Sequence, residues 1–262
     1  PTPAPPAIET PPADVATPAA TATARLTLGD LASRVNAAWA DVESYRVVSV
    51  VMAPPNPGAT PVAAAEATPG ATPVATSEQI VATRDVILPD LQHLTVTGWG
   101  VNDFEAISDG ETIYLRGPLA QQFDASASPD MWLMLRASDI PEDTQAANLL
   151  GGLPTIPMPP LAGIDERLAP QEVRDLGPME VGGRTCQTYG TADTKLTTGQ
   201  RVDNIVGIDE DDLPCFIETR SGTTTYGHQE YSLFNEVPAL DVPAVATPVA
   251  VPALLATPVH HD

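Results

Sequence analysis

The tripeptide Ala-Thr-Pro recurs along the chain and marks segments that a packed core cannot include. Proline fixes φ and lacks a backbone N–H donor, while alanine and threonine offer little surface to bury. The segments around the repeats also carry few charges and almost no aromatic residues. We therefore expect them to be extended and solvated. The copies lie at 16–18, 59–61, 67–69, 71–73, 246–248 and 256–258.

These segments divide the chain into one domain and its connections. We expect 1–25 to be a disordered Pro/Ala/Thr tether, 26–240 a single domain, and 241–262 a disordered Pro/Ala/Val tail. Within the domain, 53–78 is a low-complexity insertion. About 190 residues remain outside these segments, which is enough for one hydrophobic core. Threonine beside proline also suits O-glycosylated stalks, so a plain tether and a glycosylated one both stay open.

The charge balance restricts the partners of this chain. Twelve basic and thirty-four acidic residues give a net charge of −22. Nucleic-acid binding needs clustered Lys and Arg, so no nucleic-acid partner is expected, and direct docking on an anionic membrane is disfavoured for the same reason. No run approaches the roughly 20 apolar residues of a spanning helix. The chain starts at Pro1 rather than at methionine, and we expect a removed upstream segment such as a signal peptide.

Two helices are expected. Thr27 and Asp30 have the spacing of a capping box, and apolar residues then recur with a helical period, which predicts a helix over 28–43. A second helix is expected over 141–151, where Pro141 would occupy the first helical position.

The rest of the domain reads as short strands separated by turn signals. Asp109-Gly110 and Gly182-Gly183 both predict tight turns between antiparallel strands. So many antiparallel connections predict an α+β fold: a strongly curved antiparallel sheet, or incomplete β-barrel, with two or more helices covering its concave face. The expected strands are 45–52, 80–88, 91–97, 104–108, 111–116, 171–176, 179–181, 184–189, 202–208, 215–220 and 223–233.

Cys186 and Cys215 are the two cysteines of the chain. They are not in a CxxC spacing, which disfavours a zinc site. We expect a disulfide in an exported protein; the alternative is two reduced, buried thiols.

Several motifs occur in an order found in a known family. They are Trp39-Ala-Asp-Val-Glu-Ser44 before Tyr45-Arg46-Val47, Glu105–Tyr114 with Trp132 after it, Val181–Cys186 with Tyr189, Val206–Asp209 with Leu213-Pro214, and Tyr231–Glu236 before Val242-Pro243. This series resembles the LolA-like and LppX/LprG-type lipoprotein carriers, which are exported lipid-binding proteins with an incomplete β-barrel closed by helices. The resemblance covers about 31–243. The insertion and the absence of an acylated cysteine depart from the family pattern.

The resemblance implies a non-enzymatic exported carrier or sensor, which holds a lipid or an acylated protein's chain between sheet and helices. It implies no catalytic residue and no cofactor, and the chain has no GxSxG, HExxH or P-loop signature. A monomer is expected, tethered outside the cytoplasm at the bacterial cell surface or in the periplasm by an anchor upstream of this chain. The alternative is a cell-envelope scaffolding or protein-interaction module whose core is filled.

Apolar strand residues are the candidate ligand contacts. Small aliphatic side chains suit acyl chains, since burying each methylene contributes roughly 0.8 kcal/mol. Each of them could equally fill a core. The set is Val48, Val50, Leu94, Val96, Ile107, Ile113, Leu115, Leu133, Leu135, Leu149, Val206, Ile208 and Ile217.

Polar candidates are fewer. His228 and Glu230 share a strand face, but no third ligand accompanies them, so a metal or acid–base role is disfavoured. His93 is expected to face solvent. The acidic run 209–212 could hold calcium, although a solvated hairpin turn is favoured because an EF-hand spacing is missing. No metal site is predicted.

Overall fold

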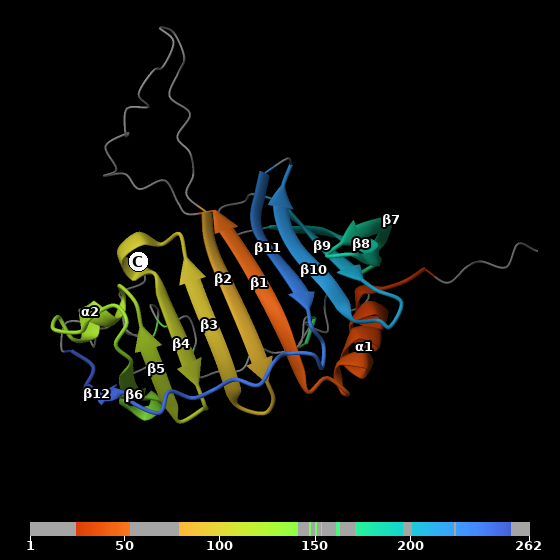
Figure 1. Ribbon diagram of the computed structural model, residues 1–262. Coiled ribbons are helices and arrows are strands. Elements are labelled where there is room, and N and C mark those ends of the chain that lie inside the picture. Colours follow the sequence, from red (N-terminus) through yellow and green to blue (C-terminus); the bar gives the residue numbers. More distant parts are fainter. Residues whose placement is uncertain are drawn as a thin grey trace, which may run out of the picture.

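One twelve-stranded sheet organises the domain (Figure 1). Its order is β12-β6-β5-β4-β3-β2-β1-β11-β10-β9-β8-β7. β12 is parallel to β6, and the other neighbouring pairs are antiparallel. The computed structural model describes residues 25–52, 79–140, 147, 150, 153, 161–162, 171–195, 201–222 and 224–252.

Ten of the twelve strands lie where strands were expected, although β8 extends to Lys195, and β6 and β12 were not among the expected ranges. Their bounds are β1 (Ser44–Met52), β2 (Gln79–Ile87), β3 (Leu91–Thr97), β4 (Phe104–Ser108), β5 (Thr112–Arg116), β6 (Leu133–Arg136), β7 (Arg174–Val181), β8 (Arg184–Lys195), β9 (Arg201–Ile208), β10 (Pro214–Ser221), β11 (Thr224–Ser232) and β12 (Thr247–Pro248). The helices are α1 (Leu28–Trp39) and α2 (Ala120–Phe123), with short 3-10 turns η1 (Gly100–Asn102) and η2 (Ala137–Asp139).

The predicted turns are confirmed. Asp109 accepts hydrogen bonds from the backbone of Glu111 and Thr112 at 3.1 and 2.7 Å, and so closes the β4–β5 hairpin. Gly182 and Gly183 connect β7 to β8 with φ of 57° and 80°. Residues other than glycine adopt positive φ angles only at a cost in free energy, so the turn needs this Gly-Gly dipeptide.

The first helix begins as predicted and ends earlier. Thr27 and Asp30 form both hydrogen bonds of the capping box. The helix ends at Trp39 rather than at residue 43, and the following residues turn into β1, where Val42 is still buried. The prediction of 28–43 was therefore too long at its C-terminal end.

The fold is mostly β rather than α+β. Among the described residues, α1 is the one helix of seven or more residues. The helix expected over 141–151 lies outside the described residues, apart from Ala147 and Leu150. No helix in the described part of the chain is long and apolar enough to cross a membrane. The strong curvature of the sheet stays a prediction.

The C-terminal segment corrects the domain boundary. Residues 241–262 were expected to be a disordered tail, yet 241–252 continue the fold. The backbone N–H groups of Thr247 and Val249 donate to carbonyl groups of Trp132 and β6 at 2.9 and 3.0 Å. The domain therefore extends past 240. The expected tether and the insertion 53–78 lie outside the described residues, except for Arg25.

The two faces of the sheet differ in chemistry. Residues paired in register point to the same face, so the pairings trace each face across the strands. One side of the sheet carries mostly apolar residues, and we call it the apolar face. It is marked by Tyr45, Val86, Leu94, Ile113, Leu133, Tyr231, Ile217, Val206 and Tyr189. The opposite, polar face carries ion pairs, including Arg46 with Asp85 at 2.6 Å and Glu105 with both His93 and Arg116 at 2.9 and 2.7 Å.

Two helices cover opposite ends of the apolar face (Figure 1). Leu31 and Val35 of α1 are fully buried against Val206 and Ile208. At the other end, Phe123 of α2 belongs to a larger cluster over β3 to β6. Burial of these side chains, worth roughly 1.5–3 kcal/mol each, holds the helices on the sheet.

Candidate functional site

The register sorts the candidate ligand contacts between the two faces. Nine of the thirteen lie on the apolar face, three lie on the polar face, and Leu149 lies outside the described residues. The nine are Leu94, Val96, Ile113, Leu115, Leu133, Leu135, Val206, Ile208 and Ile217.

Three candidates cannot line the same surface as the rest. Val48, Val50 and Ile107 point away from α1 and α2. The strand 45–52 carries valine on both faces, and Tyr45 and Val47 are the residues that are buried on the apolar side. Val48 and Val50 therefore lie on the polar face, because a shift of one residue reverses the face in a strand, and their contact with a ligand stays a prediction.

Most candidates on the apolar face are packed in clusters. Eight of the nine are buried, with exposed fractions of 7% or less, and Ile217 is half-buried. These eight fill the core beneath α1 and α2. Direct contact between them and a ligand stays a prediction.

A hollow lies between the two covered ends of the apolar face. Its volume is about 200 Å³. Val51 is 48% exposed there, and a Cβ atom placed on Gly227 would meet no atom within 4 Å. We call this place the mid-sheet hollow. It is lined by Ser49, Val51, Ile217, Thr219, Gly227, His228 and Gln229.

The hollow is built by three neighbouring strands. Ser49 pairs with Gln229, and Val51 pairs with Gly227, between β1 and β11. Ile217 in β10 pairs with the same Gln229 from the other side. Ser49, Val51, Thr219, Gly227 and Gln229 were not among the predicted contacts. Correct alternation from Val47 would have found Ser49 and Val51.

Two polar side chains interrupt the apolar face near Val86. Gln92 is fully buried, and neither atom of its amide has a hydrogen-bond partner in the described structure. Arg84 lies diagonally across from it on β2, and burial lowers the pKa of its guanidinium. Leaving a buried amide unpaired costs roughly 1–3 kcal/mol, so a polar group of a ligand would be stabilised here.

A larger hollow is charged. It measures about 650 Å³ and lies between α1 and the turn after β9. Arg34 forms an ion pair with Asp212 there, and this hydrogen bond raises the pKa of Arg34. Asp30 and Asp211 complete its acidic lining. Such a surface does not suit an acyl chain, because each charged group would lose hydration.

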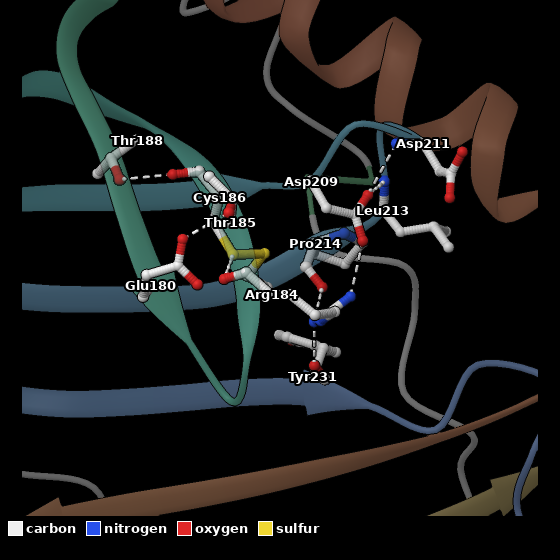
Figure 2. The surroundings of a disulfide bond; sticks show 11 residues. Glu180, Arg184, Thr185, Cys186, Thr188, Asp209, Asp211, Leu213, Pro214 and Tyr231 are labelled. Carbon is white, nitrogen blue, oxygen red and sulfur yellow. Dashed lines mark hydrogen bonds and ion pairs between the residues drawn. A yellow bond between two sulfur atoms is a disulfide. The ribbon is translucent and has the colours of Figure 1, made fainter.

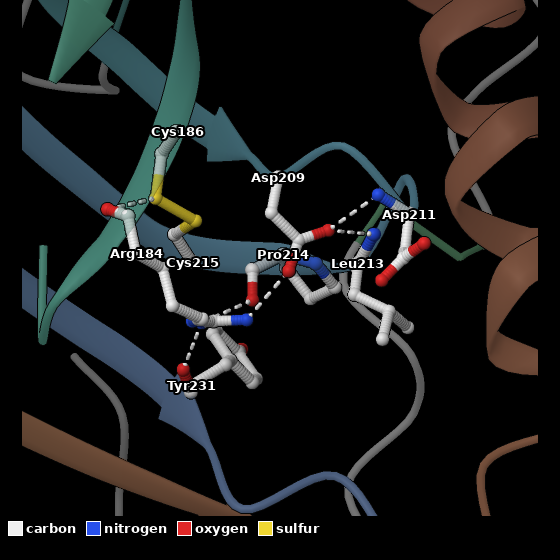
Figure 3. A network of polar contacts seen from close by, with 8 residues as sticks. All are labelled: Arg184, Cys186, Asp209, Asp211, Leu213, Pro214, Cys215 and Tyr231. Atoms are coloured by element: carbon white, nitrogen blue, oxygen red, sulfur yellow. Dashed lines mark hydrogen bonds and ion pairs between the residues drawn. A yellow bond between two sulfur atoms is a disulfide. The ribbon is translucent and has the colours of Figure 1, made fainter. Parts of the chain in front are cut away.

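The acidic run 209–212 is a hairpin turn, as predicted (Figure 3). One oxygen of Asp209 accepts from the N–H groups of Asp211 and Leu213 at 3.1 and 3.0 Å. Its other oxygen pairs with Arg184 at 2.8 Å. Both oxygens therefore serve the turn. Among the described residues, no three His, Cys, Asp or Glu side chains are placed to hold a metal ion.

The histidines lie on the polar face. His228 Nδ1 is 3.6 Å from Glu218 on the adjacent strand, and the His228 ring stacks on Phe216 at 5.7 Å between centroids. His93 Nε2 is 2.9 Å from Glu105, so it belongs to an ion network and is half-buried. The pair of His228 and Glu230 suggested by the sequence is thus not the contact that His228 makes.

The predicted disulfide is confirmed (Figure 2). Cys186 and Cys215 are fully buried, with Cα atoms 6.3 Å apart. The residue after Cys186 pairs with Ile208, the last residue of β9. The bond thus joins β8 to β10 next to the end of the strand that separates them.

Residues from distant motifs meet around Trp39. Its ring contacts Tyr45, Phe234 and Tyr231 edge-on at centroid distances of 4.8, 5.8 and 6.2 Å. The guanidinium of Arg184 lies 5.4 Å from the Phe234 ring centroid and donates to the Tyr231 carbonyl. Three of the five motifs that suggested the family therefore meet in a structural junction rather than at the hollow.

Asn235 completes this junction. Its side-chain oxygen accepts from the N–H groups of Glu43 and Ser44 at 2.6 and 3.3 Å, and its amide donates to the Asp41 carbonyl at 3.1 Å. These bonds hold the turn between α1 and β1. They give a physical reason why the helix does not continue through residue 43.

Comparisons with known proteins give structural likenesses only. No family model matches the chain, and no curated protein matches it by sequence. Solved structures that it resembles include the lipoprotein LppX of Mycobacterium tuberculosis, with a TM-score of 0.41 and 10% identity over 82% of this chain and 98% of that one. A LolA superfamily protein of Nitrosomonas europaea has a TM-score of 0.29 and 10% identity over 83% and 96%.

A third likeness is to the MucA/MucB complex of Pseudomonas aeruginosa. Its TM-score is 0.33, with 14% identity over 78% of this chain and 55% of that one. Since these TM-scores are below 0.5, the functional proposal below rests on the chain's own geometry.

Proposed function

We propose that this protein is a non-enzymatic exported carrier or sensor that holds a lipid, or the acyl chain of a lipoprotein, on its apolar face. One observation carries the proposal: the apolar face is covered at both ends, and the half-exposed Val51 leaves it open at the mid-sheet hollow. The aliphatic Val51 and Ile217 line that opening beside the polar or small Ser49, Thr219, Gly227, His228 and Gln229. The two aliphatic side chains would attract hydrocarbon without fixing its shape.

The size of the hollow limits what it can hold. Its volume of about 200 Å³ is below the roughly 300–1,000 Å³ of typical ligand pockets. A long acyl chain would therefore place only one part there. The remainder would need movement of a covering segment, such as α1. The buried amide of Gln92 would then supply a donor for an ester or amide carbonyl of the ligand.

Gly227→Phe tests this function directly. The position has open space above it, so the new ring would fill the hollow without displacing backbone. We expect the affinity for a fluorescent fatty acid to fall at least about tenfold, which is 1.4 kcal/mol. Val50→Phe is the matched control, because Val50 is next to Val51 in β1 but points to the polar face. The affinity of this variant for the fluorescent fatty acid should equal that of the wild type.

Native mass spectrometry of the purified protein provides the independent readout. A co-purifying lipid that disappears in Gly227→Phe supports the carrier. Wild-type protein that carries no lipid and binds no fluorescent fatty acid contradicts it, and so does an equal loss of binding in the Val50→Phe control.

A protein-interaction module is the second candidate. This candidate is favoured because eight of the nine candidate residues on the apolar face are buried, so the core on that face is largely filled. In that case the exposed Val51 would contact a protein partner, and no lipid would be bound. The same binding experiments separate the two functions.

The disulfide supports a location outside the cytoplasm. Cytosolic thiols are kept reduced, whereas exported proteins keep such bonds. An upstream membrane anchor followed by the Pro/Ala/Thr segment would hold the domain away from the membrane surface, as a monomer bound to lipid or to an acylated protein.

A further inference from the structure

One copy of the Ala-Thr-Pro repeat is part of the sheet. Thr247 and Pro248 form β12 along β6. The N–H group of Thr247 donates to the Trp132 carbonyl and that of Val249 donates to Met134 of β6, while Pro248 lies between these two donors. Alternate residues of a strand direct their N–H groups to opposite sides, so the missing N–H of Pro248 would have pointed away from β6. Proline therefore costs this pairing no hydrogen bond.

The side chains of the same segment add a second requirement. Val249 and Val251 pack against the cluster under α2. Val245, before the repeat, is 85% exposed. The β6 edge thus accepts a short segment with two donors two residues apart, proline between them, and valine directly after the proline.

Three other segments of the chain meet the same requirement. Residues 59–63 and 71–75 both read Ala-Thr-Pro-Val-Ala, which is identical to 246–250, and residues 256–260 read Ala-Thr-Pro-Val-His. The copies at 16–20 and 67–71 have alanine or glycine in place of the valine. These differences provide internal controls, because only the valine side chain reaches the core.

We propose that the edge of β6 is a docking groove for Ala-Thr-Pro-Val-Ala, and that the insertion of a second copy of this chain occupies it when residues 246–250 leave. The two molecules would then be joined by one parallel strand pair of the kind seen in β12. The pentapeptides of the insertion are identical in sequence to the segment already seated there, so the groove offers each the same hydrogen bonds and the contact that Val249 makes. The contact of Val251 has no equivalent, because Ala64 and Thr76 stand at that position.

Distance favours a second molecule over the same one. Six strand spacings of about 4.8 Å separate β1 from β12, which makes about 29 Å across the sheet. Thr60 follows Met52 of β1 by eight residues, which span at most about 26–29 Å when fully extended. Thr72 precedes Gln79 of β2 by seven residues, which span at most about 23–25 Å, and the five strand spacings from β2 to β12 make about 24 Å. No length remains for the offset along the strands. An insertion from another molecule has no such limit.

The resident tail competes with any second copy. A segment tethered to the same domain has an effective concentration in the millimolar range. Exchange is therefore expected when the tail is weakened or when the protein is concentrated.

The test uses the full chain with Val249→Asp, which places a charge where the valine packs. Every Val249→Asp chain used here also carries Val259→Asp, because residues 256–260 of the same tail hold another valine after Ala-Thr-Pro. A labelled peptide of residues 70–77 should bind this variant saturably in fluorescence anisotropy. Binding to the wild type and to the control Val245→Asp should be at least about tenfold weaker, because their own tails fill the groove. If Val249→Asp does not fold, Thr247→Pro serves instead, since it removes one donor.

The valine requirement decides between a groove and unspecific contact. The same peptide with Val74→Asp, and a peptide of residues 14–22 with its Ala-Thr-Pro-Ala-Ala, should not bind. In sedimentation, Val249→Asp chains should associate at high concentration, and adding Val62→Asp and Val74→Asp should abolish this. Equal binding of all peptides, or no saturable binding to the variant, overturns the proposal.

Discussion

Removal of the Cys186–Cys215 disulfide measures how strongly one covalent link restrains the unfolded chain. The cysteines are 29 positions apart. The loop-closure relation for such a length gives about 3.6 kcal/mol at 25 °C. Replacing both cysteines by alanine removes the bond, and for a domain of this size the melting temperature should fall by about 7–14 °C.

Urea unfolding followed by far-UV circular dichroism is the assay. The urea midpoint should be highest for the oxidised wild type. The reduced wild type and the double variant should have lower midpoints that nearly coincide. The reductant should leave the double variant unchanged. Thr188→Ala is a suitable control, since Thr188 is a buried neighbour on the same strand whose loss leaves the disulfide in place.

Two results would refute the reasoning. A difference below about 1 kcal/mol between wild type and double variant would mean that the bond does not restrain the unfolded chain as the loop relation requires. Destabilisation of the double variant by the reductant would show that the effect does not come from the bond.

Three further predictions concern stability, and each is checked by urea unfolding. Asn235→Ala should lower the free energy of unfolding by about 2–3 kcal/mol, since it removes three hydrogen bonds, and Asn235→Gly should recover the part due to the positive φ of 58°. Burial raises the pKa of Tyr45 to about 12, so the folded state keeps a proton that the unfolded state loses above about pH 10; stability should therefore fall between these values, less so in Tyr45→Phe. Gly207→Val should destabilise the protein by about 1–3 kcal/mol, because a Cβ atom at this position would lie 2.3 Å from the Phe216 ring. A gain in stability would contradict this overlap.

Strand positions followed from local chemistry alone. The Asp109-Gly110 turn fixed the β4–β5 hairpin, and β3 and β4 were predicted with their observed bounds. The β7 strand was expected in two pieces because Gly177 and Pro178 interrupt the pattern. The ladder absorbs this interruption with a shift of register between Asp175 and Gly177.

Features that depend on distant contacts were not predictable. The end of α1 is set by Asn235, almost two hundred residues away in sequence. The docking of 246–250 requires the edge of β6, which the repeat itself does not reveal. Proline-rich composition indicated solvation, but a proline at a non-bonding strand position fits an edge.

The sequence predicted which face of the sheet is apolar, but it did not identify most of the residues that line the hollow. Alternation in β3, β5 and β6 placed the apolar residues correctly, because polar residues separate them. In β1 the alternation is masked, since Val47, Val48 and Val50 are all apolar. Only the pairing of Tyr45 with Val86 decides which of them faces the helices.

The separation of the motif junction from the hollow has a consequence for this kind of fold. Trp39, Tyr231 and Asn235 hold the end of α1 and the start of β1 against the end of β11. Their replacement would disturb the whole sheet. Val51 and Gly227 contribute little to packing, because one is half-exposed and the other has open space above it. Residues at the hollow can therefore change with little loss of stability. If the protein binds a lipid as proposed, its ligand preference would be set by positions that carry no motif.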